Sequence, residues 1–216
     1  MPDRPPRSLR LAAVLALASV ATLGAYLVRH PILRAAGRIL VVDEGAEAAD
    51  IIVVAIDGDG AGALEAADLV HRGVAPRVAI FGAPADIVGR EFARRGVAYE
   101  DETALLIRQL QALGVTETER ISTDVVGTEN EGEVLPGWCD EHRFRSIVVV
   151  THADHSRRLR RVLHRSMKGH PTKVVVYPSR YSTFDPDRWW TARGSTRTAI
   201  VEGEKLLLDV VRHPIS

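Results

Sequence analysis

The chain has 216 residues, and its 28 lysines and arginines balance 28 aspartates and glutamates. This length suffices for one domain with a sizeable hydrophobic core. The balanced charge gives no support for a nucleic-acid partner. The single cysteine, Cys139, excludes an intramolecular disulfide and a cysteine-based zinc site.

The amino terminus combines a basic segment, residues 1–10 with three arginines, and an apolar run over 11–28 that carries no charge. Eighteen helical residues span about 27 Å, close to the hydrocarbon thickness of a bilayer. We therefore expect a transmembrane helix or uncleaved signal anchor over residues 11–29. Because arginines favour the inner side, the basic segment is expected in the cytoplasm and the domain outside a bacterial cytoplasmic membrane. A cleaved signal peptide is the alternative.

After a connector over residues 30–47, apolar runs alternate with amphipathic ones as far as residue 212. Strands are expected at 51–56, 77–81, 120–123, 147–150 and 173–177, and helices at 61–72, 86–95, 102–113, 128–142, 156–168 and 196–211. This alternation predicts a Rossmann-like three-layer α/β/α sandwich with a mostly parallel sheet over residues 48–212. The strands at 51–56 and 147–150 are expected to be neighbouring inner strands.

The stretch from Ser146 to Arg158 concentrates polar residues at the end of a buried strand. Ile147 to Val150 are apolar, and Thr151, His152 and His155 follow at once. Ligands bind at the carboxyl ends of strands in open α/β sheets. The helix that begins near residue 156 points its amino terminus at the same place, which favours an anion.

The loop Asp57-Gly-Asp-Gly60 follows the first strand. It is interpreted either as a ligand-binding loop or as a plain turn, and the pattern does not choose between them. His152 and His155 with Asp57 or Asp59 would form a metal site, although such histidine spacing alone is a weak signal. A proton-transfer or phosphate-binding role for His155 is favoured over the metal.

The carboxyl-terminal part of the chain carries two further features. Trp189 and Trp190 are interpreted as a packing clamp. Glu202 and Lys205, three residues apart, are interpreted as a surface ion pair.

Several motifs occur in a fixed order: the loop 57–60, the run 73–82, Glu129-Asn130, Thr151-x-x-x-His155-x-x-Arg158, Trp189-Trp190, and Glu202 with Lys205. This set resembles the YdcF/SanA/ElyC family, a bacterial domain of unknown function, over about residues 48–212. The resemblance implies a Rossmann-like fold, an amino-terminal anchor and a role in cell-envelope integrity. The chain departs from the family in its acidic first loop and in lacking an arginine near residues 62–64.

These observations predict a membrane-anchored, exported domain for cell-envelope maintenance, including peptidoglycan. Its expected ligand is a phosphorylated, nucleotide-like or lipid-linked small molecule, with the membrane as a further partner. The alternatives are a non-catalytic regulator of cell-wall synthesis and a metal-dependent phosphohydrolase. No cofactor or protein partner is indicated. The predicted catalytic residues are His155 and Arg158, and the predicted ligand-binding residues are Asp57, Gly58, Glu129, Asn130, Thr151 and His152.

Overall fold

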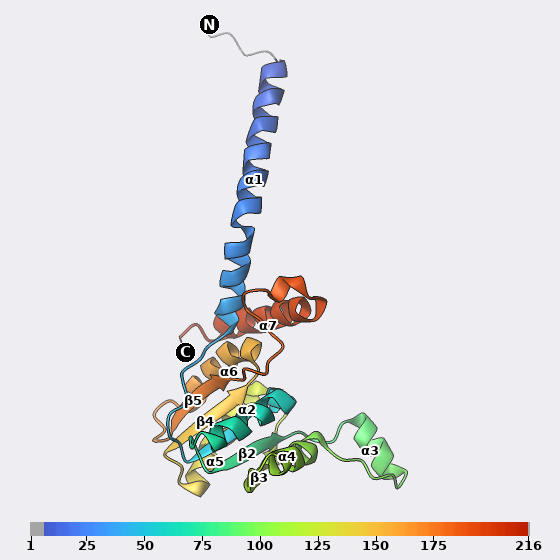
Figure 1. Cartoon of the computed structure of the whole chain (residues 1–216), viewed down its shortest axis with the longest axis vertical. Coiled ribbons are helices and arrows are strands. Elements are labelled where there is room, and N and C mark those ends of the chain that lie inside the picture. Colours follow the sequence, from blue (N-terminus) through green and yellow to red (C-terminus); the bar gives the residue numbers. More distant parts are fainter. Residues whose placement is uncertain (1–6, 216) are drawn as a thin grey trace.

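The computed structural model describes residues 7–215, without the side chains of residues 7–15, 18, 21 and 25. Residues 1–6 of the expected cytoplasmic segment lie outside the described residues. The described part consists of an α/β body and a long amino-terminal helix that projects from it (Figure 1).

Five parallel strands form the centre of the body, in the order β3-β2-β1-β4-β5. They are β1 (Ile51–Val54), β2 (Arg77–Gly82), β3 (Glu117–Asp124), β4 (Ser146–Thr151) and β5 (Lys173–Pro178). β1 and β4 pair directly, with Ile51 opposite Ile147, so the prediction that they are neighbouring inner strands is confirmed. The strand order reverses between these two strands, which is where doubly wound sheets bind ligands.

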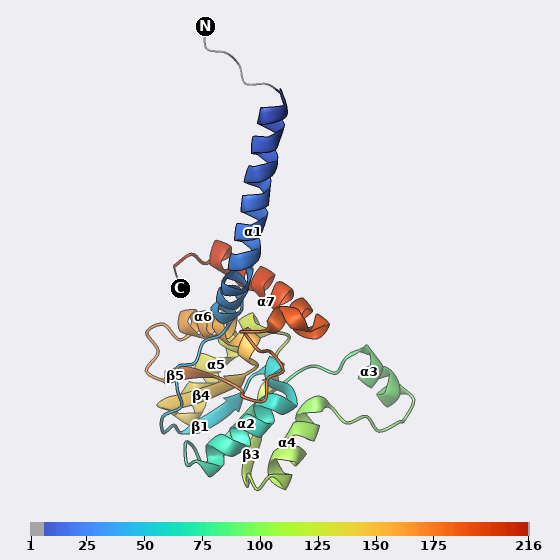
Figure 2. The same cartoon turned by 45° about the horizontal axis from the view of Figure 1, so that its top comes forward.

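Helices cover both faces of the sheet, as the alternating pattern predicts (Figure 2). Helices α2 (Asp59–His71) and α4 (Glu102–Ala112) pack over Ile52 and Val54 on one face. Helices α5 (Thr128–His142) and α6 (Ser156–Ser166) pack over Ile51 and Val53 on the other. Helix α7 (Arg193–Arg212) lies against α6. The α/β/α layers thus follow from strands whose side chains alternate between two helix-covered faces.

Helix α1 (Arg7–Leu40) corrects the prediction for the amino terminus. Among the residues that the structure describes, no helix is both long and apolar enough to cross a membrane. The predicted transmembrane helix over residues 11–29, and the single-pass localisation derived from it, are therefore wrong. The uncharged run is one part of a longer helix, which continues through Arg29, Arg34 and Arg38 instead of ending in a connector.

The tryptophan segment fastens the end of α1 to the body. The Trp189 indole Nε1 donates a hydrogen bond to the Leu33 carbonyl at 2.7 Å, and the Trp190 ring stacks on His30. A Cβ on Gly37 would lie 2.3 Å from the Pro186 carbonyl oxygen, so only glycine fits this contact. The prediction that Trp189 and Trp190 form a packing clamp is confirmed.

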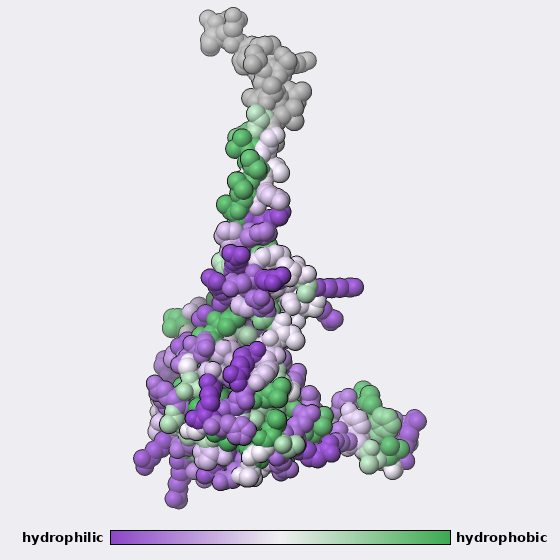
Figure 3. All heavy atoms as spheres, viewed as in Figure 1, coloured by the Kyte–Doolittle hydropathy of each residue, from purple (hydrophilic) through white to green (hydrophobic). Residues whose placement is uncertain are grey.

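Helix α3 (Ile87–Arg94) stands away from the rest of the body on an arm over residues 83–100 (Figures 1 and 3). Its apolar side chains are open to solvent, with Ile87 76% exposed and Phe92 40% exposed. A helix was expected at 86–95, but its separation from the body was not.

Candidate functional site

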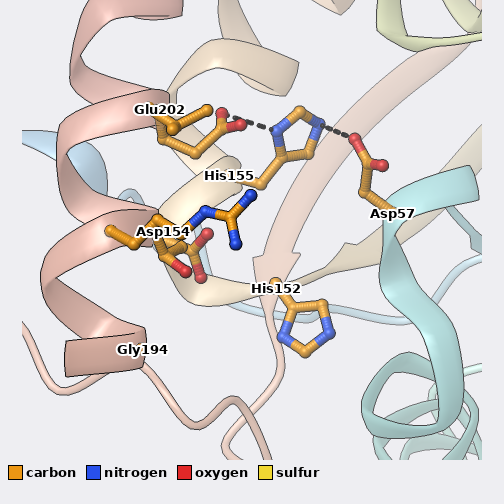
Figure 4. A pocket seen from close by; sticks show the side chains of 9 residues that line it. Asp57, His152, Asp154, His155, Gly194 and Glu202 are labelled. Atoms are coloured by element: carbon orange, nitrogen blue, oxygen red, sulfur yellow. Dashed lines mark hydrogen bonds and ion pairs between the residues drawn. The ribbon is translucent and has the colours of Figure 1, made fainter. Parts of the chain in front are cut away.

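A pocket opens where β1 and β4 end, at the point of strand-order reversal. β1 leads into the 3₁₀ turn η1 (Ile56–Gly58), and β4 leads into η2 (Ala153–His155). The first turns of α7 form the opposite wall (Figure 4). The cavity has a volume of about 510 Å³, and its lining includes Asp57, His152, Asp154, His155, Gly194, Arg197 and Glu202.

The His155 ring lies between two carboxylates at the inner end of this pocket (Figure 4). Its Nδ1 is 3.1 Å from Glu202 Oε2, and its Nε2 is 3.3 Å from Asp57 Oδ2. Nε2 is also 3.2 Å from the Thr128 hydroxyl oxygen. The residue is only 2% exposed, so both nitrogens depend on protein or ligand partners.

Arg158 places a further donor against the same ring. Its Nε donates to Glu202 Oε2 at 3.0 Å, its Nη1 donates to Thr128 at 2.8 Å, and its Nη2 is 2.9 Å from His155 Nδ1. A guanidinium can only donate, so the Nη2 contact favours an unprotonated Nδ1, whereas Glu202 favours a protonated one. A carboxylate lies at each ring nitrogen, Glu202 at Nδ1 and Asp57 at Nε2, an arrangement that suits a residue that transfers protons.

Glu202 is part of the site and not of the surface, so the interpretation as a surface ion pair is wrong. Its exposure is 7%, and Lys205 Nζ donates to its second oxygen at 2.7 Å. Burial alone would raise the pKa of Glu202. Hydrogen bonds from His155, Arg158 and Lys205 outweigh burial and bring this pKa far below its usual range.

Two other predicted ligand-binding residues, Gly58 and Thr151, lie in the turn and the strand end next to the pocket. A Cβ on Gly58 would lie 2.9 Å from Val54 Cγ1 and 3.3 Å from the Val150 carbonyl oxygen, so the close approach of η1 to β4 requires glycine. Thr151 is fully buried, and its hydroxyl lacks a hydrogen-bond partner among the described residues. Neither side chain lines the pocket.

His152 lies at the pocket wall and faces the other acid of the first loop. Its Nε2 is 3.7 Å from Asp59 Oδ2, and this interaction raises the pKa of His152 above its usual value. Asp59 adopts φ 46°, a conformation that is unfavourable for a residue with a side chain. In the loop 57–60, Asp57 lies against His155 and Asp59 lies against His152. The loop is therefore more than a plain turn.

The predicted acid–amide pair is not in the pocket. The Glu129 carboxylate binds Arg165 Nη2 at 3.1 Å, and Asn130 Nδ2 donates to Glu133 at 2.6 Å. The residues on either side of the pair face inward instead: Thr128 contacts His155, and Glu131 is completely buried.

Glu131 was not identified from the sequence. Its Oε1 accepts a hydrogen bond from the Ile56 amide at 2.7 Å, which fixes the turn that carries Asp57. Its Oε2 has no hydrogen-bond partner in the described part of the chain. Burial, reinforced by the negative charge of Asp57, raises the pKa of Glu131 to about 8.

A metal centre finds no support in this geometry. Among the described residues, no group of three or more His, Cys, Asp and Glu side chains is arranged to hold a metal ion. The pairs His155–Asp57 and His152–Asp59 are separate, and the second carboxylate at His155, that of Glu202, lies at the other ring nitrogen.

No family model matches this chain, and no curated protein is significantly similar to it. The functional argument therefore depends on the geometry of the pocket.

Proposed function

We propose that this domain binds a phosphorylated small molecule in the pocket at the carboxyl edge of the sheet, and that His155 exchanges a proton with it. One observation carries the proposal: the buried His155 ring lies between Glu202 and Asp57 at the inner end of the cavity. The cavity volume of about 510 Å³ is in the range typical of small-molecule sites.

Three cationic side chains in or beside the pocket, Arg158, Arg197 and Lys205, offset its three carboxylates, Asp57, Asp154 and Glu202. Glu202 is paired with two cations, Arg158 and Lys205, so it adds little net negative charge. Arg197 lines the pocket and has no hydrogen bond or ion pair in the described part of the chain. A phosphate group entering beside Arg197 would form a charge-assisted contact without breaking an existing pair.

Asp57 controls access to His155 Nε2. Its carboxylate is 3.3 Å from this nitrogen, but its side chain is half exposed and can move when a ligand enters. Hydrolysis or transfer at phosphate would use Nε2 as the acid or base. A role in cell-envelope maintenance is supported only by the resemblance to the YdcF/SanA/ElyC family.

The proposal is tested with the full chain, by calorimetric titration with inorganic phosphate and by an assay of p-nitrophenyl phosphate hydrolysis. His155→Gln and Arg158→Ala should each weaken phosphate binding about ten- to a hundredfold, because each removes a charge-assisted contact or its support. Arg165→Ala is the matched control, since Arg165 lies on the same helix but binds Asp209 and Glu129.

Equal weakening by all three substitutions would show a diffuse basic surface and contradict the pocket. The absence of phosphate binding by the unaltered protein would contradict the proposal as a whole. Phosphate binding without hydrolysis would identify a non-catalytic binding domain.

A further inference from the structure

Two charged side chains of the pocket form no ion pair with another side chain among the described residues. Asp154 in η2 is only 9% exposed, yet no side chain within the described residues pairs with its carboxyl group. Arg197, on the α7 wall of the same pocket, has no partner there either.

Two other buried acids, on α7, are paired instead. Glu202 is paired with Arg158, and Asp209 with Arg161 and Arg165. Burying an unpaired carboxylate costs free energy unless another group hydrogen-bonds it. Burial accordingly raises the pKa of Asp154 above its usual value.

Asp154 and Arg197 both line one cavity, so a single ligand can contact both. We propose that Asp154 and Arg197 select a hydroxylated phosphate ester of the sugar phosphate type. Arg197 binds the phosphate, and Asp154 accepts a hydrogen bond from a hydroxyl group on the carbon skeleton. This inference depends on the proposed function, whose phosphate-bearing ligand it makes more specific.

The shape and charge of the pocket favour a hydroxylated skeleton over a bare phosphate or an amine. Inorganic phosphate alone would fill only a small part of about 510 Å³ and would leave Asp154 without a donor. An ammonium group would share the pocket with the charged Arg197 side chain and be repelled by it, whereas a hydroxyl group donates a hydrogen bond to Asp154 without that repulsion. Val201 provides an apolar contact for the ring carbons of a sugar.

The test compares sugar phosphates with cyclohexylmethyl phosphate, which is similar in size to glucose 6-phosphate but has no hydroxyl groups on its ring. The full chain is titrated with glucose 6-phosphate, ribose 5-phosphate, inorganic phosphate and cyclohexylmethyl phosphate. We expect at least one sugar phosphate to bind about tenfold more tightly than cyclohexylmethyl phosphate, a difference typical of one hydrogen bond to a charged group.

Substitutions test whether Asp154 contacts the hydroxyl group and Arg197 contacts the phosphate. Asp154→Ala should remove the preference for the sugar phosphate and leave cyclohexylmethyl phosphate binding unchanged. Asp154→Leu, which is similar in size and has no hydrogen-bond acceptor, provides the same comparison if the alanine protein fails to fold. Arg197→Ala should weaken all four phosphates about tenfold. Arg193→Ala, one turn earlier on α7 and outside the pocket lining, is the matched control and should change nothing.

The outcomes separate this inference from the proposed function. If cyclohexylmethyl phosphate binds as tightly as both sugar phosphates, the selection by Asp154 is wrong, although phosphate binding stands. If Arg197→Ala leaves binding unchanged, Arg197 is not the phosphate contact and the inference fails. If none of the four phosphates binds, both proposals fail.

Discussion

Two clusters of ion pairs join α6 to α7, and their sequence spacing is the same. Arg158 binds Glu202 in the first, and Arg165 binds Asp209 in the second, seven residues further along each helix. Both acids are buried, and both arginines are mostly covered. Only the first cluster adjoins the pocket.

The difference lies in what surrounds each pair. In the second cluster, Arg161 also binds Asp209, and the remaining donors of Arg165 and Arg161 reach Glu129 and the His213 carbonyl oxygen. In the first, Glu202 shares one oxygen between Arg158 and His155, and that ring reaches the cavity. An ion pair thus indicates function here only where it adjoins a titratable group and an opening.

Glu131 differs from the acids of both clusters, because it is buried without a salt-bridge partner among the described residues. Its pKa is 4.5 in the unfolded reference and about 8 in the fold, so the folded protein keeps this proton up to a higher pH. The contribution of Glu131 to stability is then fully present below pH 4.5 and is lost as pH rises through 8. The two pKa values correspond to a loss of up to about 5 kcal/mol.

Glu131→Gln should remove this decline, because glutamine keeps an acceptor for the Ile56 amide but does not titrate. The free energy of unfolding is measured in urea at pH 5 and pH 8.5. Glu133→Gln, exposed on the same helix, is the control and should retain the full decline. A Glu131→Gln protein with the pH dependence of the unaltered chain would show that Glu131 is ionised in the fold.

Asp209→Ala breaks the second cluster and should cost about 3 kcal/mol of stability, because it leaves two poorly exposed arginines without their shared partner. Urea unfolding measures the loss. Inorganic phosphate binding by the protein that remains folded should be unchanged, since Asp209 does not line the pocket. A matching loss of phosphate affinity would show that the two clusters act as one.

The inner strands β1 and β4 were predictable because they are short runs of β-branched residues that only a covered sheet can bury. The edge strand β3 is mostly polar and exposed, and it extends over Glu117–Asp124 and not only over the predicted 120–123. The amino-terminal helix was not predictable, because an uncharged run looks the same whether or not its helix continues into charged residues. Helix α3 was predicted from its local pattern, but its position depends on tertiary contacts that the pattern does not contain.

Site residues that follow the ends of strands were predictable from the sequence. Site residues whose direction depends on how a helix is rotated about its axis were not. Asp57 and His155 follow neighbouring strands, so topology alone brings them together. Each residue of α5 turns 100° about the axis, so Thr128 and Glu131 face inward while Glu129 and Asn130 turn away. Glu202 reaches His155 from 47 residues away, a pairing that no local pattern reveals.

The smallest effect is expected at the pocket wall, where Asp59 raises the pKa of His152. A histidine with a raised pKa contributes stability below its unfolded value of 6.5, and this is lost as pH rises through the folded pKa. Asp59→Asn should therefore lower the pKa of His152 towards 6.5, measured by NMR titration of its ring proton. Asp59 is 55% exposed, so solvent screening should keep the change in stability below about 0.5 kcal/mol. An unchanged His152 titration would show that Asp154 or Asp57, the other acids acting on this ring, raises its pKa instead.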